Sequence, residues 1–220
     1  MIADERIADY IRSLDRGNGP LLDQIEEEAR REDVPIIRKE TSAFLKTLIA
    51  ACRPRRILEV GTAVGYSALL MGRVMPPECR ITTIEKFPPR IEAARENFRL
   101  AGEEGRVELL EGDAEEILYT LDGPFDFIFM DAAKGQYIHW LPRVLELLGE
   151  GGILLSDNIF QDGDVVQSRF AVERRDRTIH KRMREYLFAL THDERLETSL
   201  LPVGDGAAVS VKIGSQGGRT

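Results

Sequence analysis

The feature that most constrains the fold is the regular alternation of short apolar segments with helical segments after about residue 55. Such alternation is typical of a parallel sheet covered by helices, because consecutive parallel strands need a long crossover connection. The expected strands are Arg56–Val60, Arg80–Ile84, Val107–Leu110, Asp126–Met130 and Gly152–Ser156, and the expected helices between them are Ser67–Arg73, Pro89–Ala101, Ala114–Leu121 and Tyr137–Leu148.

The two ends of the chain differ from this alternating middle. Near the C-terminus, Val203-Gly204-Asp205-Gly206 is a hairpin turn signal between two further expected strands. Before residue 55 we expect only helices. Pro35 separates the second of these helices from the third, because proline breaks a helix. We therefore expect a single α/β domain over residues 1–220, with a helical N-terminal cap at 1–54 and a core at 55–213. The additional elements are strands Glu197–Pro202 and Ala207–Ile213, which complete a mostly parallel seven-stranded sheet, and helices Ala3–Leu14, Pro20–Glu32 and Lys39–Ala51.

Composition excludes several classes of protein. With 220 residues and 43% hydrophobic content, the chain can bury one sizeable core. The first residues lack a signal pattern, and no apolar run approaches the roughly 20 residues that a membrane span needs. Cys52 and Cys79 are too few for a disulfide framework or a zinc site, so we expect reduced thiols in a cytoplasmic protein. The formal net charge of −8 argues against indiscriminate binding of nucleic acid, although it leaves a local basic patch open.

Oxygen-bearing side chains follow two of the expected strands. Met130-Asp131-Ala132-Ala133-Lys134 ends one strand and Ser156-Asp157-Asn158 ends another. In an open parallel sheet, groups at the carboxyl ends of the strands converge on one crevice. Two carboxylates and an amide oxygen suit a hard divalent cation, Mg²⁺ with Mn²⁺ or Ca²⁺ as alternatives, rather than zinc. The plainer interpretation of Asp157-Asn158 alone is a turn that caps the following segment.

The first expected strand runs into a glycine-containing turn, Glu59-Val60-Gly61-Thr62-Ala63-Val64-Gly65. Gly61 and Gly65 allow a sharp turn and a close approach to a ligand, although an ordinary strand-to-helix turn also uses glycine. A dinucleotide fingerprint needs glycine where this chain has Ala63. Glu59 is expected to point into the same mouth, where its carboxylate would repel a pyrophosphate. It would suit a ligand that carries an ammonium and a sulfonium.

Two further acids agree with such a ligand. Glu85 closes the second expected strand, where it can accept hydrogen bonds from both ribose hydroxyls, and Asp113 follows the third, within reach of an adenine amine. Any one of these acids is more often a helix cap or a solvated surface group. Three acids at successive strand ends of one sheet favour a common ligand, S-adenosylmethionine.

Three segments resemble motifs of the cation-dependent O-methyltransferases, the family of the catechol and caffeoyl-CoA enzymes. They are Ile57–Ser67, Phe125–Lys134 and Ser156–Asn158, within a similarity that runs from Val34 to Gly206. The resemblance implies a Rossmann-like class I methyltransferase fold, often a homodimer, with residues 55–213 as its catalytic core. It implies cofactor contacts at Ile37, Glu59, Gly61, Ser67, Glu85, Ala114 and Asp131, to which the strand-end position of Asp113 adds one more. Ile37 departs from the plant members, which tend to have threonine there, so its contact can use only backbone or apolar surface.

The resemblance also assigns the chemistry. It implies Asp131, Asp157 and Asn158 as metal ligands and Lys134 as general base. A hydroxyl is a poor nucleophile at neutral pH, and a chelated cation lowers its pKa and orients it for attack on the sulfonium methyl. A surface lysine is normally solvated, but one beside a cation has reason for a lowered pKa and could accept the hydroxyl proton.

Chelation through two oxygens restricts the substrate to groups such as catechols or 5-hydroxyuridine. The segment Arg169–Arg184 is strongly basic within an acidic chain, and we expect it at the rim of the site. It could bind phosphates, or it could simply be a solvated helix face. The whole chain resembles the bacterial tRNA 5-hydroxyuridine methyltransferases, which convert the wobble uridine to 5-methoxyuridine. Shared features are Asp33–Ile36, Asp131–Tyr137 and the basic segment.

We therefore expect the substrate to be the tRNA anticodon loop. A small catechol or other phenol is the alternative, and a catalytically silent protein that binds S-adenosylmethionine is a third hypothesis. The ligand trio and Lys134 count against the third, because a binding module has no need of them. Of the remaining residues, His180 is expected on the basic face, His192 in a loop, and Tyr137 and Phe160 in packing or stacked on a substrate ring.

Overall fold

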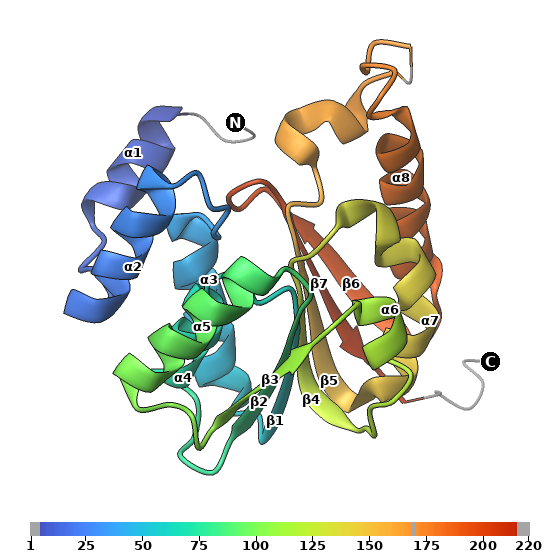
Figure 1. Cartoon of the computed structure of the whole chain (residues 1–220). Coiled ribbons are helices and arrows are strands. Elements are labelled where there is room, and N and C mark those ends of the chain that lie inside the picture. Colours follow the sequence, from blue (N-terminus) through green and yellow to red (C-terminus); the bar gives the residue numbers. More distant parts are fainter. Residues whose placement is uncertain (1–4, 169, 215–220) are drawn as a thin grey trace.

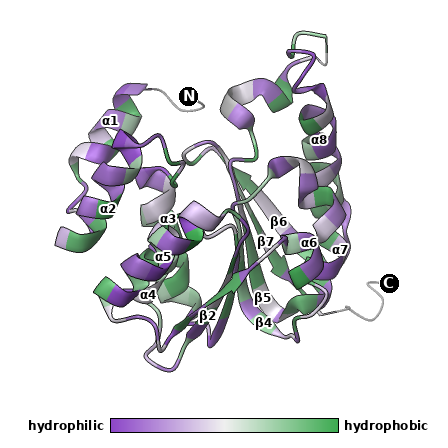
Figure 2. Ribbon diagram, in the orientation of Figure 1, coloured by the Kyte–Doolittle hydropathy of each residue, from purple (hydrophilic) through white to green (hydrophobic). Residues whose placement is uncertain are grey.

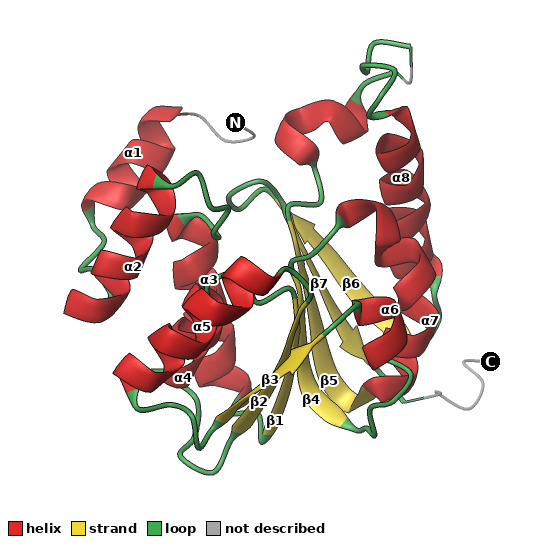
Figure 3. Ribbon diagram, in the orientation of Figure 1, coloured by secondary structure: helices red, strands yellow, loops and turns green. Residues whose placement is uncertain are grey.

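The structure is a computed structural model that describes residues 5–168 and 170–214. Within these residues seven strands form one sheet in the order β3-β2-β1-β4-β5-β7-β6 (Figure 3). Pairing is parallel from β3 to β5, and β7 lies antiparallel to both β5 and β6. The predicted fold class is confirmed. The strands are β1 (Arg56–Val60), β2 (Arg80–Glu85), β3 (Val107–Glu111), β4 (Phe125–Met130), β5 (Leu148–Asp157), β6 (Leu196–Leu201) and β7 (Ala207–Lys212).

Helices cover both faces of the sheet (Figure 1). On one side lie α1 to α5, and on the other lie α6, α7 and α8, with α8 packed along α7. The helices are α1 (Glu5–Ser13), α2 (Pro20–Arg31), α3 (Lys39–Cys52), α4 (Tyr66–Gly72), α5 (Pro88–Ala101), α6 (Ala114–Ile117), α7 (Tyr137–Leu147) and α8 (Arg177–His192), with the short 3-10 helices η1 (Lys134–Gln136) and η2 (Gln161–Val166).

The strands are apolar on both faces because each face is covered. In β4, Phe127 and Phe129 pack into the core on the α3–α5 side, whereas Ile128 and Met130 pack into the core on the α7–α8 side. This alternation follows from the two-residue period of a strand. Figure 2 shows the result: the central strands carry hydrophobic residues, and the helices mix hydrophobic with hydrophilic ones.

Helix α8 is the principal element that the sequence analysis did not predict. Its sixteen residues are rich in arginine and lysine, so the apolar stripe is hard to recognise among the charges. That stripe consists of buried residues at roughly helical spacing, His180, Met183, Tyr186 and Leu190. Two predictions are therefore wrong. His180 is 3% exposed with its Nε2 3.2 Å from the Gln167 carbonyl oxygen, instead of lying on the basic face, and His192 ends the helix instead of lying in a loop.

Smaller differences concern the ends of elements. Helix α6 ends at Ile117, earlier than the predicted Leu121, and β5 begins at Leu148, earlier than the predicted Gly152. The early start of β5 is possible because Leu148 pairs with Phe125 across an irregularity in the β4–β5 register. No helix in the described part of the chain is long and apolar enough to cross a membrane.

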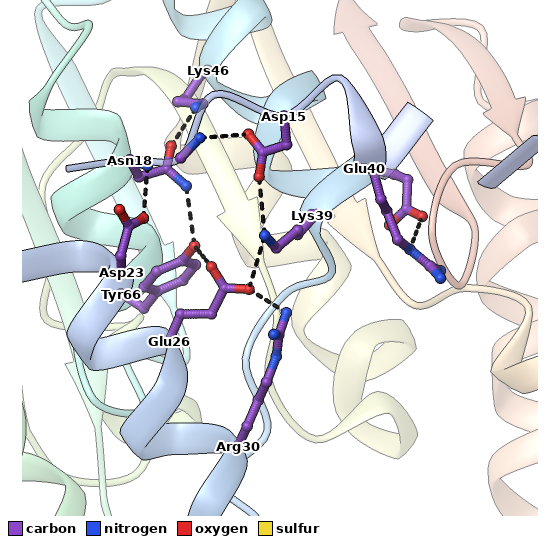
Figure 4. Close-up of polar contacts among 11 residues, drawn as sticks. Asp15, Asn18, Asp23, Glu26, Arg30, Lys39, Glu40, Lys46 and Tyr66 are labelled. Atoms are coloured by element: carbon purple, nitrogen blue, oxygen red, sulfur yellow. Dashed lines mark hydrogen bonds and ion pairs between the residues drawn. The ribbon is translucent and has the colours of Figure 1, made fainter. Parts of the chain in front are cut away.

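A polar network joins the N-terminal helices to the helix that follows β1 (Figure 4). At its centre is Glu26 of α2, which is 6% exposed and accepts a hydrogen bond of 3.2 Å from the hydroxyl of Tyr66, the first residue of α4. Asn18 donates to the same hydroxyl at 3.3 Å, and the Lys39 ammonium lies 3.2 Å from Asp15 and 3.9 Å from Glu26. Buried polar groups need such partners. The network therefore ties α2 and α3 to the start of α4.

Candidate functional site

A cavity of about 530 Å³ lies at the carboxyl ends of the parallel strands. Its walls come from the α2–α3 connection, from the loops after β1 to β5, and from the β6–β7 hairpin. Most of the predicted site residues line it, namely Ile37, Gly61, Glu85, Asp113, Ala114, Asp131, Lys134, Asp157 and Asn158. Convergence of these residues at one crevice is what the position of strand ends in an open parallel sheet predicts.

Gly61 holds the β1 and β4 loops together. Its φ is +103°, in the region that favours glycine, and a Cβ atom there would collide with the carbonyl oxygen of Asp131. The Asp131 amide donates to the Val60 carbonyl at 3.0 Å. The glycine is therefore required for the close approach of two loops within the protein, in addition to any approach of a ligand.

Glu59 differs from its prediction. It is fully buried and does not line the cavity. Its two carboxylate oxygens accept hydrogen bonds of 2.5 Å from Ser67 Oγ and from Thr83 Oγ1. Burial raises the pKa of Glu59 to about 7, although these two hydroxyls act in the opposite direction; the charges of Asp131 and Glu85 add to the rise. The expectation that Glu59 points into the mouth is wrong, because the side chain lies among Ser67 and Thr83, where it fixes the start of α4.

Glu85 is held by the backbone. Its Oε2 accepts from the Ala63 amide at 2.9 Å, and its Oε1 accepts from the amides of Lys86 and Phe87 at 2.9 and 3.0 Å. A carboxylate has about four acceptor positions, so these three bonds leave room for a further donor. The side chain lines the cavity in one fixed orientation.

Asp113 is the N-cap of α6. Its Oδ1 accepts from the Glu115 amide at 3.0 Å, and its Oδ2 lies 3.1 Å from Lys86 Nζ. The bond from the Glu115 amide, supported by Lys86, lowers the pKa of Asp113. The plainer interpretation of this acid as a helix cap is therefore correct, and the same residue also lines the cavity beside Ala114.

Lys134 forms an ion pair with Asp131. Its Nζ lies 2.8 Å from Asp131 Oδ1 and 3.4 Å from the hydroxyl of Tyr137. Burial alone would lower the pKa of the Lys134 ammonium, but the neighbouring Tyr137, Asp131 and Asp157 raise it overall above its usual value. Tyr137 and the two carboxylates therefore outweigh the burial of the ammonium, and the lowered pKa that we expect for this lysine beside a bound cation stays a prediction.

Asp157 is the last residue of β5 and Asn158 follows it, and both line the same cavity. Asp157 is 6% exposed, and Thr41 Oγ1 donates to its Oδ1 at 3.4 Å. Burial and the charge of Asp131 raise the pKa of Asp157 to about 7, against the effect of Lys134. Asn158 has a φ of +57° and so begins a sharp turn out of the strand.

The donor set fits a hard cation. Among the described residues no group of three or more His, Cys, Asp or Glu side chains is gathered to hold a metal. The candidate set consists instead of the carboxylates of Asp131 and Asp157 and the amide of Asn158, all at the cavity wall. The charge of Asp131 raises the pKa of the buried Asp157, and a divalent cation between two such carboxylates would stabilise both charges; oxygen donors suit Mg²⁺ or Ca²⁺.

Sequence reasoning predicted the packing of Tyr137 but missed its hydrogen bonds and the pairing of Arg38 with Asp205. Tyr137 is fully buried, so it does not stack on a substrate; its hydroxyl donates to the Met130 carbonyl at 2.9 Å and accepts from the Ala132 amide at 3.2 Å. Arg38 and Asp205 line the cavity from opposite ends of the chain and pair at 2.6 Å. The hairpin signal placed Asp205 in a turn, but nothing in the sequence connects it with Arg38.

Four further residues lie in or near the cavity. Trp140 of α7 is buried and lines the cavity, and Lys86 and Arg90 line it on the side of β2. Phe160 is half-buried and packs against the core on the α7–α8 side, which agrees with the packing role expected for it.

The basic segment lies beside the site but does not line the cavity. Arg169 is outside the described residues. Several other arginines are bound within the protein: the guanidinium groups of Arg177, Arg182 and Arg184 donate to the carbonyl oxygens of Val172, Gly135 and Val165 at 3.2, 3.0 and 3.1 Å. Arg174 and Arg175 are exposed, and Arg175 pairs with Glu173 and Asp176 at 3.0 and 3.4 Å. The segment is thus partly structural.

Comparisons with known proteins agree with this geometry. The model of the O-methyltransferase family matches residues 13–213, so the chain belongs to that family. A catechol O-methyltransferase of Niastella koreensis is 37% identical over 127 residues, 56% of this chain, and the chain spans 58% of that relative's length. Caffeoyl-CoA O-methyltransferase 2 of Populus trichocarpa is 32% identical over 77% of this chain and 72% of its own.

The fold comparison covers more of the chain. The crystal structure of a Podospora anserina methyltransferase with SAH bound has a TM-score of 0.86 at 30% identity and covers 96% of this chain and 95% of its own. This likeness extends from the sheet to the N-terminal helices and confirms the Rossmann-like methyltransferase architecture expected from the motifs.

Proposed function

We propose that the protein is an S-adenosylmethionine-dependent and Mg²⁺-dependent O-methyltransferase that acts on the wobble 5-hydroxyuridine of tRNA. The observation that carries the proposal is the meeting of Asp131, Lys134, Asp157 and Asn158 at one cavity, whose lining also includes Gly61, Glu85 and Ala114. The first set suits a cation and a proton acceptor, and the second suits a nucleoside with a cationic methionine part. The SAH-bound relative supports the choice of cofactor.

The cofactor end of the cavity has groups for each part of the ligand. The carboxylate of Glu85, fixed by three backbone amides, can accept from ribose hydroxyls. Ala114 and Asp113 offer backbone and carboxylate groups to the adenine. Ile37 contributes apolar surface to the lining of the cavity. Glu59 and Ser67 act from outside the cavity, by holding the first turn of α4 in place.

Asp131, Asp157 and Asn158 would hold the cation, Mg²⁺ with Mn²⁺ or Ca²⁺ as alternatives. Once bound, the cation would lower the pKa of a chelated substrate hydroxyl and orient it towards the methyl group. Lys134 is the proposed proton acceptor, through its Nζ. As an ion pair with Asp131 this amine stays protonated, so the role requires Asp131 to be engaged elsewhere, as its proposed ligand role provides.

Two methyl acceptors, 5-hydroxyuridine in tRNA and a small catechol, carry the adjacent oxygens that chelation requires. The exposed Arg174 and Arg175 near the start of α8, together with the resemblance to the bacterial tRNA enzymes, favour an RNA. The relatives' names, catechol and caffeoyl-CoA O-methyltransferase, favour a small phenol as the second candidate.

The domain organisation, oligomeric state and cellular location of the enzyme are also part of the proposal. We propose that residues 1–54 cap a catalytic core at 55–213 within one domain, since the Glu26 network ties the cap to α4. A homodimer agrees with the exposed apolar side chains of α1, Ile7, Tyr10 and Ile11. A tRNA substrate places the enzyme in the cytoplasm.

The test is methyl transfer from labelled S-adenosylmethionine, with Mg²⁺ or with a chelator, to tRNA that contains 5-hydroxyuridine and to a simple catechol. Labelling of the wobble base that disappears with the chelator is the expected result. Labelling of catechol alone would make this a small-molecule enzyme. Binding of S-adenosylmethionine without transfer to either acceptor would contradict the proposed activity.

A further inference from the structure

Helix α8 contacts both segments that carry the candidate chemistry, the loop after β4 and the end of β5. Arg182 Nη1 donates to the carbonyl oxygen of Gly135 at 3.0 Å, and Gly135 directly follows Lys134. One turn further along the helix, the hydroxyl of Tyr186 lies 2.5 Å from Ser156 Oγ, and Ser156 directly precedes Asp157 in the sequence. Residues four apart lie on the same helix face, so one face of α8 contacts both the loop of Lys134 and the end of β5.

The two contacts are connected through buried aromatic rings. Tyr186 and Tyr137 are both fully buried and meet edge to face, with their centroids 5.3 Å apart. The Tyr137 hydroxyl bonds to the backbone at Met130 and Ala132, on either side of Asp131, and lies 3.4 Å from Lys134 Nζ. Packed buried rings of this kind leave little room for independent movement. The path from Ser156 to the Lys134 loop is therefore continuous.

We propose that Arg182 and Tyr186 are positioning residues, which fix the position of the loop of Asp131 and Lys134 relative to Asp157 and Asn158 at the end of β5. The proposal rests on the proposed methyltransferase function. It gives Arg182 a use different from the phosphate binding that the basic segment suggested, since the guanidinium is half-buried and bonded to a carbonyl oxygen instead of being presented to solvent. Neither residue lines the cavity, so their effect passes through the loops.

The experiment compares Arg182→Met, which keeps the stem and removes the donors, with Arg182→Lys, which restores one donor. Arg195→Met is the matched control, because Arg195 is an exposed arginine whose bonds are to Asp193 in the α8–β6 turn. For each protein, kcat and KM are measured on hydroxyuridine-containing tRNA and on catechol. Affinity for S-adenosylmethionine is measured by calorimetry without acceptor, and amide hydrogen exchange of residues 131–137 is measured without ligands.

We expect Arg182→Met to lower kcat about ten-fold on every acceptor that the wild type methylates, since a misplaced group costs rate more than binding. KM and the cofactor affinity should change less than about two-fold, exchange in residues 131–137 should accelerate, and Arg182→Lys should recover part of kcat. Arg195→Met should match the wild type.

An unchanged kcat with a raised KM for tRNA alone would overturn the proposal and make Arg182 a phosphate contact. Unchanged exchange in residues 131–137 would also overturn it. If Arg182→Met does not fold, Tyr186→Phe, which removes only the hydroxyl that meets Ser156, is judged by the same criteria, with residues 156–160 as its exchange segment. Wild-type protein that methylates neither acceptor refutes the proposed function, whereas an active wild type with indistinguishable variants refutes the positioning role alone.

Discussion

The buried carboxyl of Glu59 makes a prediction about stability against pH. Its side chain is fully buried, accepts from Ser67 and Thr83, and has a pKa raised to about 7 from an ordinary 4.5. Between these pH values the folded protein holds more protons than the unfolded chain. The free energy of unfolding contributed by Glu59 therefore falls as the pH rises from 4.5 and levels off above about 7.

Glu59→Gln removes this dependence, because the amide stays neutral at every pH. With a pKa of about 7 in the folded protein and 4.5 in the unfolded chain, the ionisation equilibrium of Glu59 lowers the unfolding free energy by about 1 kcal/mol at pH 5 and by about 3 kcal/mol at pH 8. The difference in unfolding free energy between wild type and variant should therefore change by about 2 kcal/mol over this range, in favour of the variant at high pH. Any loss of hydrogen bonding from Ser67 or Thr83 shifts the difference equally at every pH.

The assay is urea unfolding of both proteins at four values between pH 5 and pH 8, without ligands. Glu92→Gln on the exposed face of α5 is the control, and its difference from wild type should stay flat. If the difference for Glu59→Gln also stays flat with pH, the reasoning is refuted. Such a result would mean that the pKa of Glu59 is the same in the folded and unfolded protein.

Three further predictions concern the site and its loops. Asp157→Ala should abolish methyl transfer and leave the calorimetric affinity for S-adenosylmethionine largely intact, because Asp157 belongs to the proposed cation ligands. Arg174→Ala with Arg175→Ala should raise KM for tRNA and reduce the slope of its salt dependence by about one for each phosphate that is no longer bound, with activity on catechol retained. Gly61→Ala should lower the unfolding free energy by about 3 kcal/mol, because its Cβ would collide with the Asp131 carbonyl at a positive φ.

Each of these has its own check. Turnover by Asp157→Ala that resists a chelator would contradict a metal-dependent mechanism. An equal loss on tRNA and catechol would show that Arg174 and Arg175 do not bind RNA. Gly105→Ala is the control for Gly61→Ala, since a Cβ at Gly105 meets nothing within 4 Å; equal stability of the two variants would exclude the predicted collision.

Much of the fold was readable from local patterns. The strands from β1 to β7 were all predicted within a few residues, because an apolar run between turn signals is a local property of the sequence. The site set of Asp131, Lys134 and Asp157 was also predicted, since strand ends in a parallel sheet must meet at one edge. Helix α8 was missed because charged residues interrupt its apolar stripe.

The tertiary structure decided what each polar group does. Glu59 and Glu85 look alike in the sequence as acids near strand ends, yet one is buried against Ser67 and Thr83 and the other lines the cavity. The ion pair of Arg38 with Asp205 and the bond from Arg182 to Gly135 join residues far apart in the chain. A sequence determines its strands and helices through periodicity, which acts over a few residues. The burial, pKa and partner of a side chain depend on groups brought from elsewhere by the fold, and only the packed structure supplies them.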